Sequence, residues 1–443
     1  MDAEARLDSL PRDPGTERPV PMVDPELVKR WGSAGGELVE LLAQVRERAG
    51  GVAGFRLGSG LTVLVTDPRA VQEVLALRAD RYVKRSHRAR LLIGDGVMAA
   101  TGEAWKRQRR LLQSQFTGTG MRRYERRITE AARTTAERWV AYARTGQVLD
   151  VGKEMHRFAL DAIWRSLTGH PLDDETAHEL EAVTAVGAAL PALPADADKA
   201  RDSVATDLAR IDAVAERAIE AARSGVPGPD GPGVLRVLVD AAAERPEYTD
   251  QLIRDELVTL LAAGHETTAS TLTWLYLLLD QYPAAREQAL AAGAEGSEQR
   301  RQAIQALVHE TLRLYPSAWL LPRHAAEDDT LAGHTVAAGT DILVCPYLTH
   351  RDPQLWPDPE RFDPLRFLTP GGRPTHPGAY LPFGIGSRAC LGLQFALRES
   401  TILLEHLLPV HTLSLSSTPT KANFGITVRP AGPTPATLEP AAV

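Results

Sequence analysis

The chain has 443 residues, of which 44% are hydrophobic and 24% are charged, a composition typical of soluble globular proteins. The net charge of -7, from 50 basic and 57 acidic residues, gives no global attraction to nucleic acid or to an anionic membrane. Its two cysteines, Cys345 and Cys390, cannot form a disulfide framework or a paired zinc site. We therefore expect a cytoplasmic protein without a membrane span, because the sequence contains neither a signal peptide nor about 18 consecutive apolar residues.

Most of the predicted elements are helices. Residues 1 to about 35 are rich in proline, glycine and charge, and we expect an extended lead-in there. A helix over 36–49, a hairpin from 54–58 and 61–66, and an irregular segment over 81–102 follow. Apolar periodicity then predicts helices over 124–143, 155–167 and 235–243, a long helix over 249–280 and a helix from about 391 to 408. Shorter strands are expected within 335–348 and near 411–414 and 425–429.

Cys390 lies between glycine-rich bends and an apolar helical run. Gly384 and Gly386 permit positive φ angles, so the preceding segment is expected to be an irregular loop. Backbone N–H groups at such a junction would stabilise a thiolate and tune a metal bound to it. A buried structural cysteine is the alternative for an isolated thiol.

The residues around Cys390 resemble the haem-binding signature of the cytochrome P450 family, Phe-x-x-Gly-x-Arg-x-Cys-x-Gly. The resemblance implies a mainly α fold with a smaller β portion, forming a single haem domain over residues 1–443. It also implies haem b with Cys390 as axial thiolate, Phe383 beside its sulfur and Arg388 at a propionate. The matching residues are Phe383, Gly384, Gly386, Arg388, Cys390 and Gly392.

The long helix carries polar residues in an otherwise apolar sequence, including Glu266 and Thr267. Burying such groups is costly, so they need a functional reason. The segment from Ala263 to Thr268 resembles the family motif Ala-Gly-x-Asp/Glu-Thr-Thr, which implies a local opening of the helix. In that case Thr267 would hold dioxygen and a water by hydrogen bonds, and Glu266 would relay protons. His265 occupies the variable position and is either an ordinary helix residue or a catalytic one.

Two further motifs suggest contacts with the haem propionates. Trp105 and Arg109 lie one helical turn apart and resemble the family element Trp-x-x-x-Arg. An amphipathic helix with a core tryptophan and a solvated arginine would have the same pattern. The segment 317–323 resembles the family's strand beside the haem, which implies that Arg323 contacts a propionate as well.

Glu310 and Arg313 form a Glu-x-x-Arg pair, one turn apart on a predicted helix. Alone, such a pair is typical of a solvated salt bridge. Within the family it joins the arginine of a Pro-x-Arg-Phe segment, which we assign to Arg361. The resemblance then implies a buried charge network that fixes the loop of Cys390.

The substrate is expected to be a hydrophobic small molecule such as a terpenoid, polyketide or fatty acyl compound. The apolar residues expected to line its pocket favour a hydrophobic substrate but do not distinguish among these classes. The Ala- and Pro-rich segment 183–200 resembles the mobile lid of the family. The candidate pocket residues are Leu91, Leu92, Val97, Ala262, Ala263, Trp319 and Leu320.

The resemblance implies a monomeric monooxygenase that takes two electrons from a separate ferredoxin and ferredoxin reductase. A basic cluster is either the docking site of an acidic ferredoxin or a solvated helix face. Coupling, desaturation, rearrangement or peroxide-driven oxidation are alternative outcomes. A non-catalytic haem sensor is a further alternative, but it would need no proton relay. The basic cluster comprises Lys106, Arg107, Arg110, Arg122, Arg123, Arg126 and Arg127.

Overall fold

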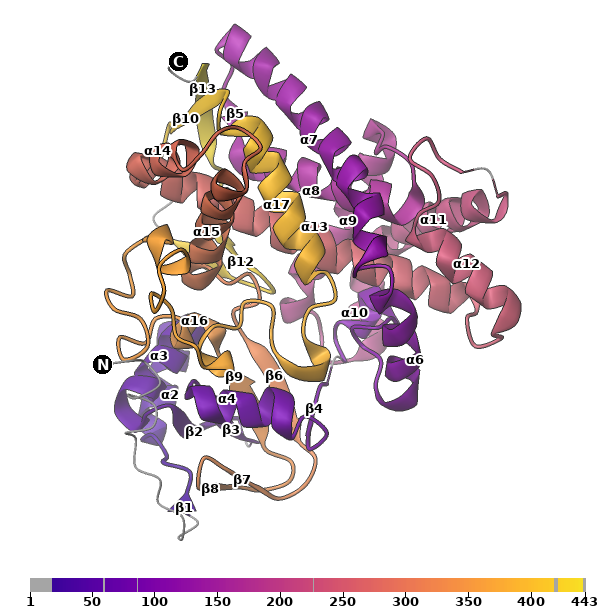
Figure 1. Ribbon diagram of the computed structural model, residues 1–443. Helices are drawn as coiled ribbons and strands as arrows, with labels where there is room; N and C mark the ends of the chain where they lie inside the picture. The colour runs from indigo at the N-terminus through magenta and orange to yellow at the C-terminus, as the bar shows by residue number, and fades with distance from the viewer. Residues whose placement is uncertain (1–17, 59, 86, 226, 418–420, 441–443) are drawn as a thin grey trace. The chain divides into compact units, whose positions relative to one another are not determined.

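The computed structural model describes residues 18–58, 60–85, 87–225, 227–417 and 421–440. The chain packs into two compact units (Figure 1). The first unit comprises the chain up to Arg85 together with His309–Cys390, and the second comprises Ser86–Val308 together with Leu391–Val443. Long helices are concentrated in the second unit, whereas the larger sheet belongs to the first.

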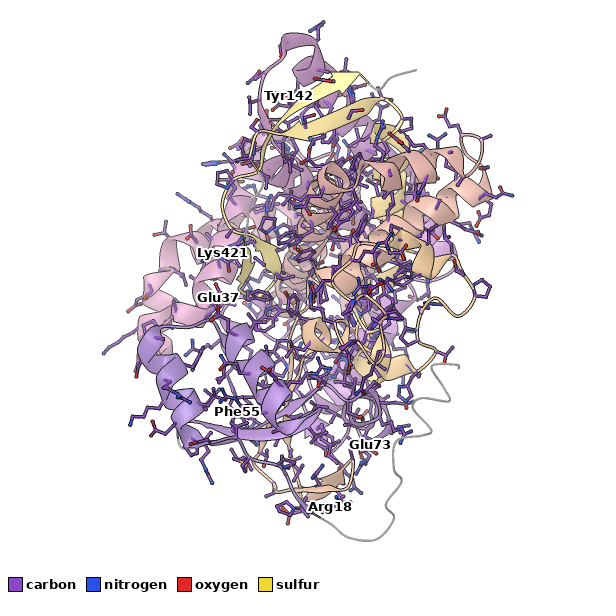
Figure 2. The ribbon with its side chains drawn as sticks, turned by 90° about the vertical axis from the view of Figure 1, so that its left-hand side faces the viewer. Arg18, Glu37, Phe55, Glu73, Tyr142 and Lys421 are labelled. Atoms are coloured by element: carbon purple, nitrogen blue, oxygen red, sulfur yellow. The ribbon has the colours of Figure 1, made fainter. Side chains whose placement is uncertain are left out.

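A five-stranded sheet with the order β2-β3-β9-β6-β4 forms the core of the first unit. β2 and β3 form the predicted hairpin, in which Phe55 lies opposite Thr62, and Figure 2 labels Phe55 on β2. β3 then pairs in parallel with β9, where Val63 and Ile342 are fully buried partners. The strands are β2 (Val52–Leu57), β3 (Gly60–Val65), β4 (Tyr82–Val83), β6 (Leu321–Ala325) and β9 (Asp341–Val344).

The predicted lead-in is wrong for residues 25–34, which form helix α2 (Pro25–Ala34). The Asp24 carboxylate accepts a hydrogen bond of 2.9 Å from the backbone N–H of Glu26, and Pro25 occupies the first turn, where it needs no hydrogen-bond partner. Residues 1–17 lie outside the described part of the chain. Helix α3 (Leu38–Ala49) follows as predicted and packs on β2.

Shorter elements complete the first unit. A small sheet has the order β1-β8-β7, and the C-terminal part of helix α15 (Glu298–Leu314) also belongs to this unit from His309 onward. The remaining elements are β1 (Arg18–Pro19), β7 (Asp329–Leu331), β8 (His334–Val336), α4 (Pro68–Gln72), the π-helical turn η1 (Glu73–Leu77), α16 (Pro346–Thr349), and the 3-10 turns η3 (Pro364–Phe367), η4 (Pro377–Ala379) and η5 (Gly386–Arg388).

Helix α13 (Asp250–Gln281) is the longest element of the second unit. Thr249 caps its start, accepting a hydrogen bond of 3.2 Å from the N–H of Leu252, and the helix ends just before Pro283, as expected from the restriction on pre-proline residues. Helix α8 (Val151–Thr168) packs along α13, as Figure 1 shows. Since α13 is buried along most of its length, its few open positions stand out.

The segment 183–200 is more helical than the sequence suggested. Helix α9 (Asp174–Ala189) continues through Val183, and η2 (Leu190–Ala192) and α10 (Ala197–Ser203) follow. Pro191 is accommodated because it lies in the first turn of η2. The segment is therefore a broken helical stretch.

The helices predicted over 124–143, 155–167, 235–243 and 391–408 and the strand near 411–414 are confirmed, whereas several further helices and strands of this unit were not predicted. Its two small sheets have the orders β10-β13-β5 and β11-β12. The elements are α5 (Arg90–Ile93), α6 (Gly102–Gln113), α7 (Thr119–Thr145), α11 (Ala205–Arg223), α12 (Val234–Glu244), α14 (Pro283–Ala291), α17 (Leu393–Leu407), β5 (Leu149–Asp150), β10 (His411–Leu415), β11 (Ala422–Phe424), β12 (Val428–Pro430) and β13 (Pro435–Pro440). Among the described helices, none combines the length and apolarity that crossing a membrane requires.

Candidate active site

The loop that carries Cys390 is held by its own backbone. The N–H of Cys390 donates a hydrogen bond of 2.8 Å to the carbonyl of Phe383, and the N–H of Gly384 donates one of 3.0 Å to Leu381. The Cys390 side chain is exposed, in contrast to that of Cys345, which is fully buried. Burial raises the pKa of the Cys345 thiol to about 12. Of the two thiols, Cys390 is therefore the one available to a ligand.

Gly386 is required by the path of this loop. Its φ is 76°, and a Cβ atom at this position would lie 2.2 Å from the carbonyl oxygen of Leu75. Any side chain would therefore collide with the backbone of η1, against which η5 packs. Gly384 also has a positive φ, of 65°. The sequence prediction of a loop with two special backbone positions is confirmed.

Glu310 and Arg313 form a fully buried ion pair. Two nitrogens of the Arg313 guanidinium each lie 2.8 Å from a different carboxylate oxygen of Glu310. The guanidinium also donates to the backbone carbonyls of His350, Pro359 and Arg361, at 2.6 to 3.0 Å. Because the donors and acceptors are matched, the pair can be buried without leaving an uncompensated charge.

The third member of this network is Arg366, and the assignment to Arg361 is wrong. The Arg361 side chain is exposed, and this residue contributes its backbone carbonyl to the network. Arg366 is buried, with its Nε 3.4 Å from Glu310 Oε1, and it donates to the carbonyl of Asp358 at 2.9 Å. The chain contains Pro-x-Arg-Phe twice, at 359–362 and 364–367. The turn at η3 directs the second arginine inward.

His350 connects this network to the cysteine loop. Its Nδ1 lies 3.2 Å from the Arg313 carbonyl, and the N–H of Leu381 donates to its Nε2 at 2.9 Å. Burial lowers the pKa of His350 to about 3, so the ring is neutral at pH 7. A neutral ring can donate from one nitrogen and accept at the other, which both contacts require. The network thus extends to the beginning of the loop.

Three cations lie near one another at the cysteine loop in the first unit, namely Lys84, Arg323 and Arg388, which itself belongs to the loop. Lys84 follows β4, and Arg323 lies in β6, the strand with which β4 pairs. Burial, with Arg323 and Arg388 nearby, lowers the pKa of Lys84 to about 8. Burial and Arg388 lower the pKa of Arg323 to about 10. Such a concentration of positive charge suits an anionic ligand.

The centre of α13 is open where the rest of the helix is buried. Ala263 is exposed, and Ala262, Gly264, Glu266 and Thr267 are half-buried. The helix is continuous here, so the predicted local opening is not present. The Thr267 hydroxyl donates a hydrogen bond of 2.9 Å to the carbonyl of Ala263. An acid and an alcohol therefore lie beside small residues, as the sequence predicted.

Glu266 has two partners that the sequence did not reveal. The Thr427 hydroxyl lies 3.2 Å from Glu266 Oε1, and the Arg429 guanidinium lies 3.4 Å from the same oxygen. Both residues belong to the turn and strand around β12, more than 150 residues away in the chain. Because no local pattern connects such distant segments, the contact could be found only in the structure.

The remaining candidate haem and pocket residues lie in both units. Trp105 and Arg109 are half-buried and one turn apart on α6, as predicted. The segment with Leu91, Leu92 and Val97 lies against α13, because a Cβ at Gly96 would approach Thr259 Oγ1 to 2.1 Å. In the first unit, Trp319 is buried and Leu320 is half-buried before β6. Their contacts with haem or substrate remain predictions.

The predicted basic cluster loses one member. Arg127 is 1% exposed, and its guanidinium donates to four backbone carbonyls at 2.9 to 3.1 Å, so it cannot contact a protein partner. The other members are exposed, although Lys106 and Arg107 face Glu103 and Glu247 at 2.6 and 3.8 Å. The carbonyl acceptors of Arg127 belong to Ser166, Asp230, Gly231 and Pro232.

The sequence model described as Cytochrome P450 matches residues 14–434 of this chain. The chain belongs to the cytochrome P450 family. It is a P450 monooxygenase, and the family carries haem with a thiolate ligand. Such enzymes need a substrate, dioxygen and redox partners.

Relatives of this P450 come from bacteria, plants and insects. It is 32% identical over 382 residues to the cyclooctatin synthase of Streptomyces melanosporofaciens, covering 80% of this chain and 81% of the relative. It is also 32% identical over 356 residues to the cytokinin hydroxylase of Arabidopsis thaliana, covering 73% and 68%. The crystal structure of the cytochrome P450DA heme domain has a TM-score of 0.83 and 24% identity, covering 97% of this chain and 99% of that one. This structural similarity shows that the chain has the fold of a P450 haem domain.

The residues present fit the haem of this family. The exposed Cys390 thiol follows a loop fixed by backbone hydrogen bonds, which suits a metal ligand. Burial and the nearby Arg388 lower the pKa values of Lys84 and Arg323, and an anionic group such as a propionate would offset the repulsion among these cations. Lys84 was not among the predicted haem contacts, although it lies in the basic run after β4.

Proposed function

We propose that this P450 oxidises a hydrophobic small molecule, and that terpenoids are the first class to test. The observation that carries the proposal is the open stretch of α13, where Ala262, Ala263 and Gly264 leave an apolar surface beside Glu266 and Thr267. Small side chains leave room for a substrate, and these three apolar positions favour one with few hydrogen-bonding atoms. Polyketides and fatty acyl compounds share this character.

The relatives support the same class. Two of them, from Streptomyces melanosporofaciens, are named cyclooctatin synthase and cyclooctat-9-en-7-ol 5-monooxygenase, and both are 32% identical to this chain. The second name describes an unsaturated alcohol that is oxidised at a carbon atom. A mainly hydrocarbon substrate with few polar groups would suit the apolar part of α13 here.

Cys390 would hold the haem iron, and Lys84, Arg323 and Arg388 would hold the propionates, with Trp105 and Arg109 as further contacts. When bound, the haem supplies the redox chemistry by which dioxygen is activated. The hydrogen bond from the Cys390 N–H to the Phe383 carbonyl fixes the backbone at the ligand. The Glu310 network would stabilise the loop further through His350 and Leu381.

Glu266 and Thr267 would manage the protons of the reaction. The Thr267 hydroxyl proton is held on the Ala263 carbonyl, and rotation of its side chain would direct the same proton toward dioxygen. Glu266 Oε1 accepts from Thr427 and Arg429, so the carboxylate is anchored at one oxygen. The half-buried Glu266 would then exchange protons between solvent and the site.

Electrons would come from a ferredoxin and its reductase. The six exposed members of the basic cluster provide positive charge that would attract an acidic ferredoxin. Arg110, Arg122 and Arg123 have no carboxylate within the ion-pair distances found among the described residues, whereas Lys106 and Arg107 do. These three arginines are therefore the strongest docking candidates.

A screen for substrate-induced spectral shifts tests the substrate class. The full-length haem protein would be titrated with matched panels of terpenoids, fatty acids and polyketide lactones, and the Soret band would report displacement of water from the iron. We expect at least one terpenoid to produce a saturable shift, with weaker responses from the other panels. A saturable shift only with fatty acids or lactones would contradict the terpenoid assignment.

Thr267→Ala should separate consumption of electrons from formation of product. The variant lacks the hydroxyl that would deliver a proton, so we expect product formation to fall roughly 10²-fold, while NADPH oxidation with ferredoxin and reductase continues. Thr267→Ser retains the hydroxyl and should keep most of the product yield. An unchanged ratio of product to NADPH in Thr267→Ala would exclude the proposed role.

A further inference from the structure

Two histidines and a threonine from three helices of the second unit meet at one point. Thr184 Oγ1, from α9, lies 3.0 Å from His156 Nε2 on α8 and 3.0 Å from His265 Nε2 on α13. The imidazole rings are perpendicular, with their centroids 4.8 Å apart. Since both Nε2 atoms contact the same oxygen, both point toward a common position.

The hydrogen bonds determine which nitrogens carry protons. His265 Nδ1 lies 2.6 Å from the Leu261 carbonyl, which can only accept, so Nδ1 donates. His265 Nε2 then has its lone pair directed outward and accepts from the Thr184 hydroxyl. Because that hydroxyl has one proton, its oxygen accepts from His156 Nε2, and this ring would shift its proton to Nδ1 when Nε2 binds a metal. A histidine with one nitrogen fixed by a carbonyl and the other free to coordinate is the usual arrangement of metal-binding imidazoles.

Glu266 brings a carboxylate to the same place. One oxygen of Glu266 and one ring nitrogen each of His156 and His265 all lie within 4.8 Å of one another. A tetrahedral Zn²⁺ with bonds of about 2.1 Å needs ligand atoms about 3.4 Å apart. Separations of up to 4.8 Å are longer than this, so binding would draw the three side chains closer together. Rotation of the Thr184 side chain about χ1 would withdraw its oxygen from between the two imidazoles.

We propose that His156, His265 and Glu266 form a binding site for a divalent transition-metal ion such as Zn²⁺. Two imidazoles and one carboxylate favour borderline metals over Mg²⁺ or Ca²⁺, which prefer oxygen ligands. Water would complete the coordination. The three residues of the site belong to one compact unit.

Burial favours neutral imidazoles at this site, and a neighbouring arginine limits its affinity for a metal. Burial, with His265 and Arg429 nearby, lowers the pKa of His156 to about 3, and burial also lowers the pKa of His265. Metal binding at pH 7 therefore requires no loss of an imidazolium proton. Arg429 lies 3.4 Å from Glu266 Oε1 and competes with the metal for that carboxylate. Because the ligands are two imidazoles and a carboxylate, we expect the affinities to follow the Irving–Williams order, with Cu²⁺ binding more tightly than Ni²⁺ or Zn²⁺.

Metal binding would also inhibit turnover, because the ion would draw Glu266 away from Thr427 and Arg429. This consequence rests on the proposed proton-relay role of Glu266, whereas the metal site itself does not. The two ideas can be separated by measuring binding and turnover on the same samples.

Zn²⁺ binding is best measured on the full-length haem protein at pH 7, in competition with a chromophoric chelator. We expect one specific Zn²⁺ per chain, and at least about tenfold weaker binding in His156→Ala and in His265→Ala. Thr184→Ala should bind Zn²⁺ at least as well as the parent, because the hydroxyl occupies the central position. His178→Ala is the matched control, since His178 is exposed on α9 and faces Glu181 at 3.4 Å.

The outcomes are distinct. The absence of one specific Zn²⁺ in the parent protein, or equal affinities in His156→Ala and His178→Ala, would overturn the site. Circular dichroism and the haem spectrum identify a variant that fails to fold, and His156→Gln then replaces His156→Ala as the test. Specific Zn²⁺ binding without any effect on turnover would confirm the metal site and contradict the role of Glu266.

Discussion

Replacing Cys390 with serine is expected to abolish monooxygenase activity and the spectrum of a thiolate-ligated haem. The reduced protein with carbon monoxide should show a strongly red-shifted Soret band in the parent, and Cys390→Ser should lose it because an alcohol does not provide the thiolate ligand. The measurement is a difference spectrum of equal amounts of folded protein, checked by circular dichroism.

Cys345→Ala is the control for this prediction. Cys345 is fully buried beside β9, and burial raises the pKa of its thiol to about 12, so it is not expected to ligate the iron. The red-shifted band should survive in Cys345→Ala. If the band persisted in Cys390→Ser, or disappeared in Cys345→Ala while the fold was retained, the assignment of the ligand would be wrong.

Arg366→Ala should destabilise the protein strongly, whereas Arg361→Ala should not. Arg366 is buried against Glu310, and removing one member of a buried charge network typically costs about 3 to 5 kcal/mol of unfolding free energy. Arg361 is exposed and contributes its backbone carbonyl, which alanine retains, so we expect a change within about 0.5 kcal/mol. Chemical denaturation followed by circular dichroism would measure both.

The comparison of these two variants also tests how the cysteine loop is supported. The network reaches Leu381 through His350, so Arg366→Ala should release haem at lower denaturant concentrations than Arg361→Ala. Equal stabilities of the two variants would show that Glu310 and Arg313 suffice without a third charged partner.

Local patterns predicted the parts of the fold that depend on local interactions. The helix α13 and the hairpin β2–β3 were predicted because their apolar periodicity extends over many residues. The cysteine loop was predicted because Gly384 and Gly386 permit backbone angles that other residues rarely adopt. Helix α2 was not predicted because the surrounding proline and glycine residues indicated a loop. Asp24 and Pro25 nevertheless form a typical helix N-terminus, with Asp24 as the N-cap and Pro25 in the first turn.

The errors at charged residues have a common cause. A run of arginines predicts a charged surface, but Arg127 shares a helix face with the buried Tyr124 and Ala131, so its position in the helical period already pointed inward. Arg361 and Arg366 occupy equivalent places in two copies of one motif, and the turn η3, which contains Arg366, decides which is buried. The contacts of Glu266 with Thr427 and Arg429 join distant segments, so sequence spacing contains no sign of them.

The most direct test of the proposed reaction is turnover under ¹⁸O₂ with ferredoxin, its reductase and a substrate found by the spectral screen. We expect one ¹⁸O atom to enter each product molecule, and we expect Thr267→Ala to make much less of this product per NADPH. A product without ¹⁸O, or one formed equally well with peroxide alone, would contradict the proposed reaction.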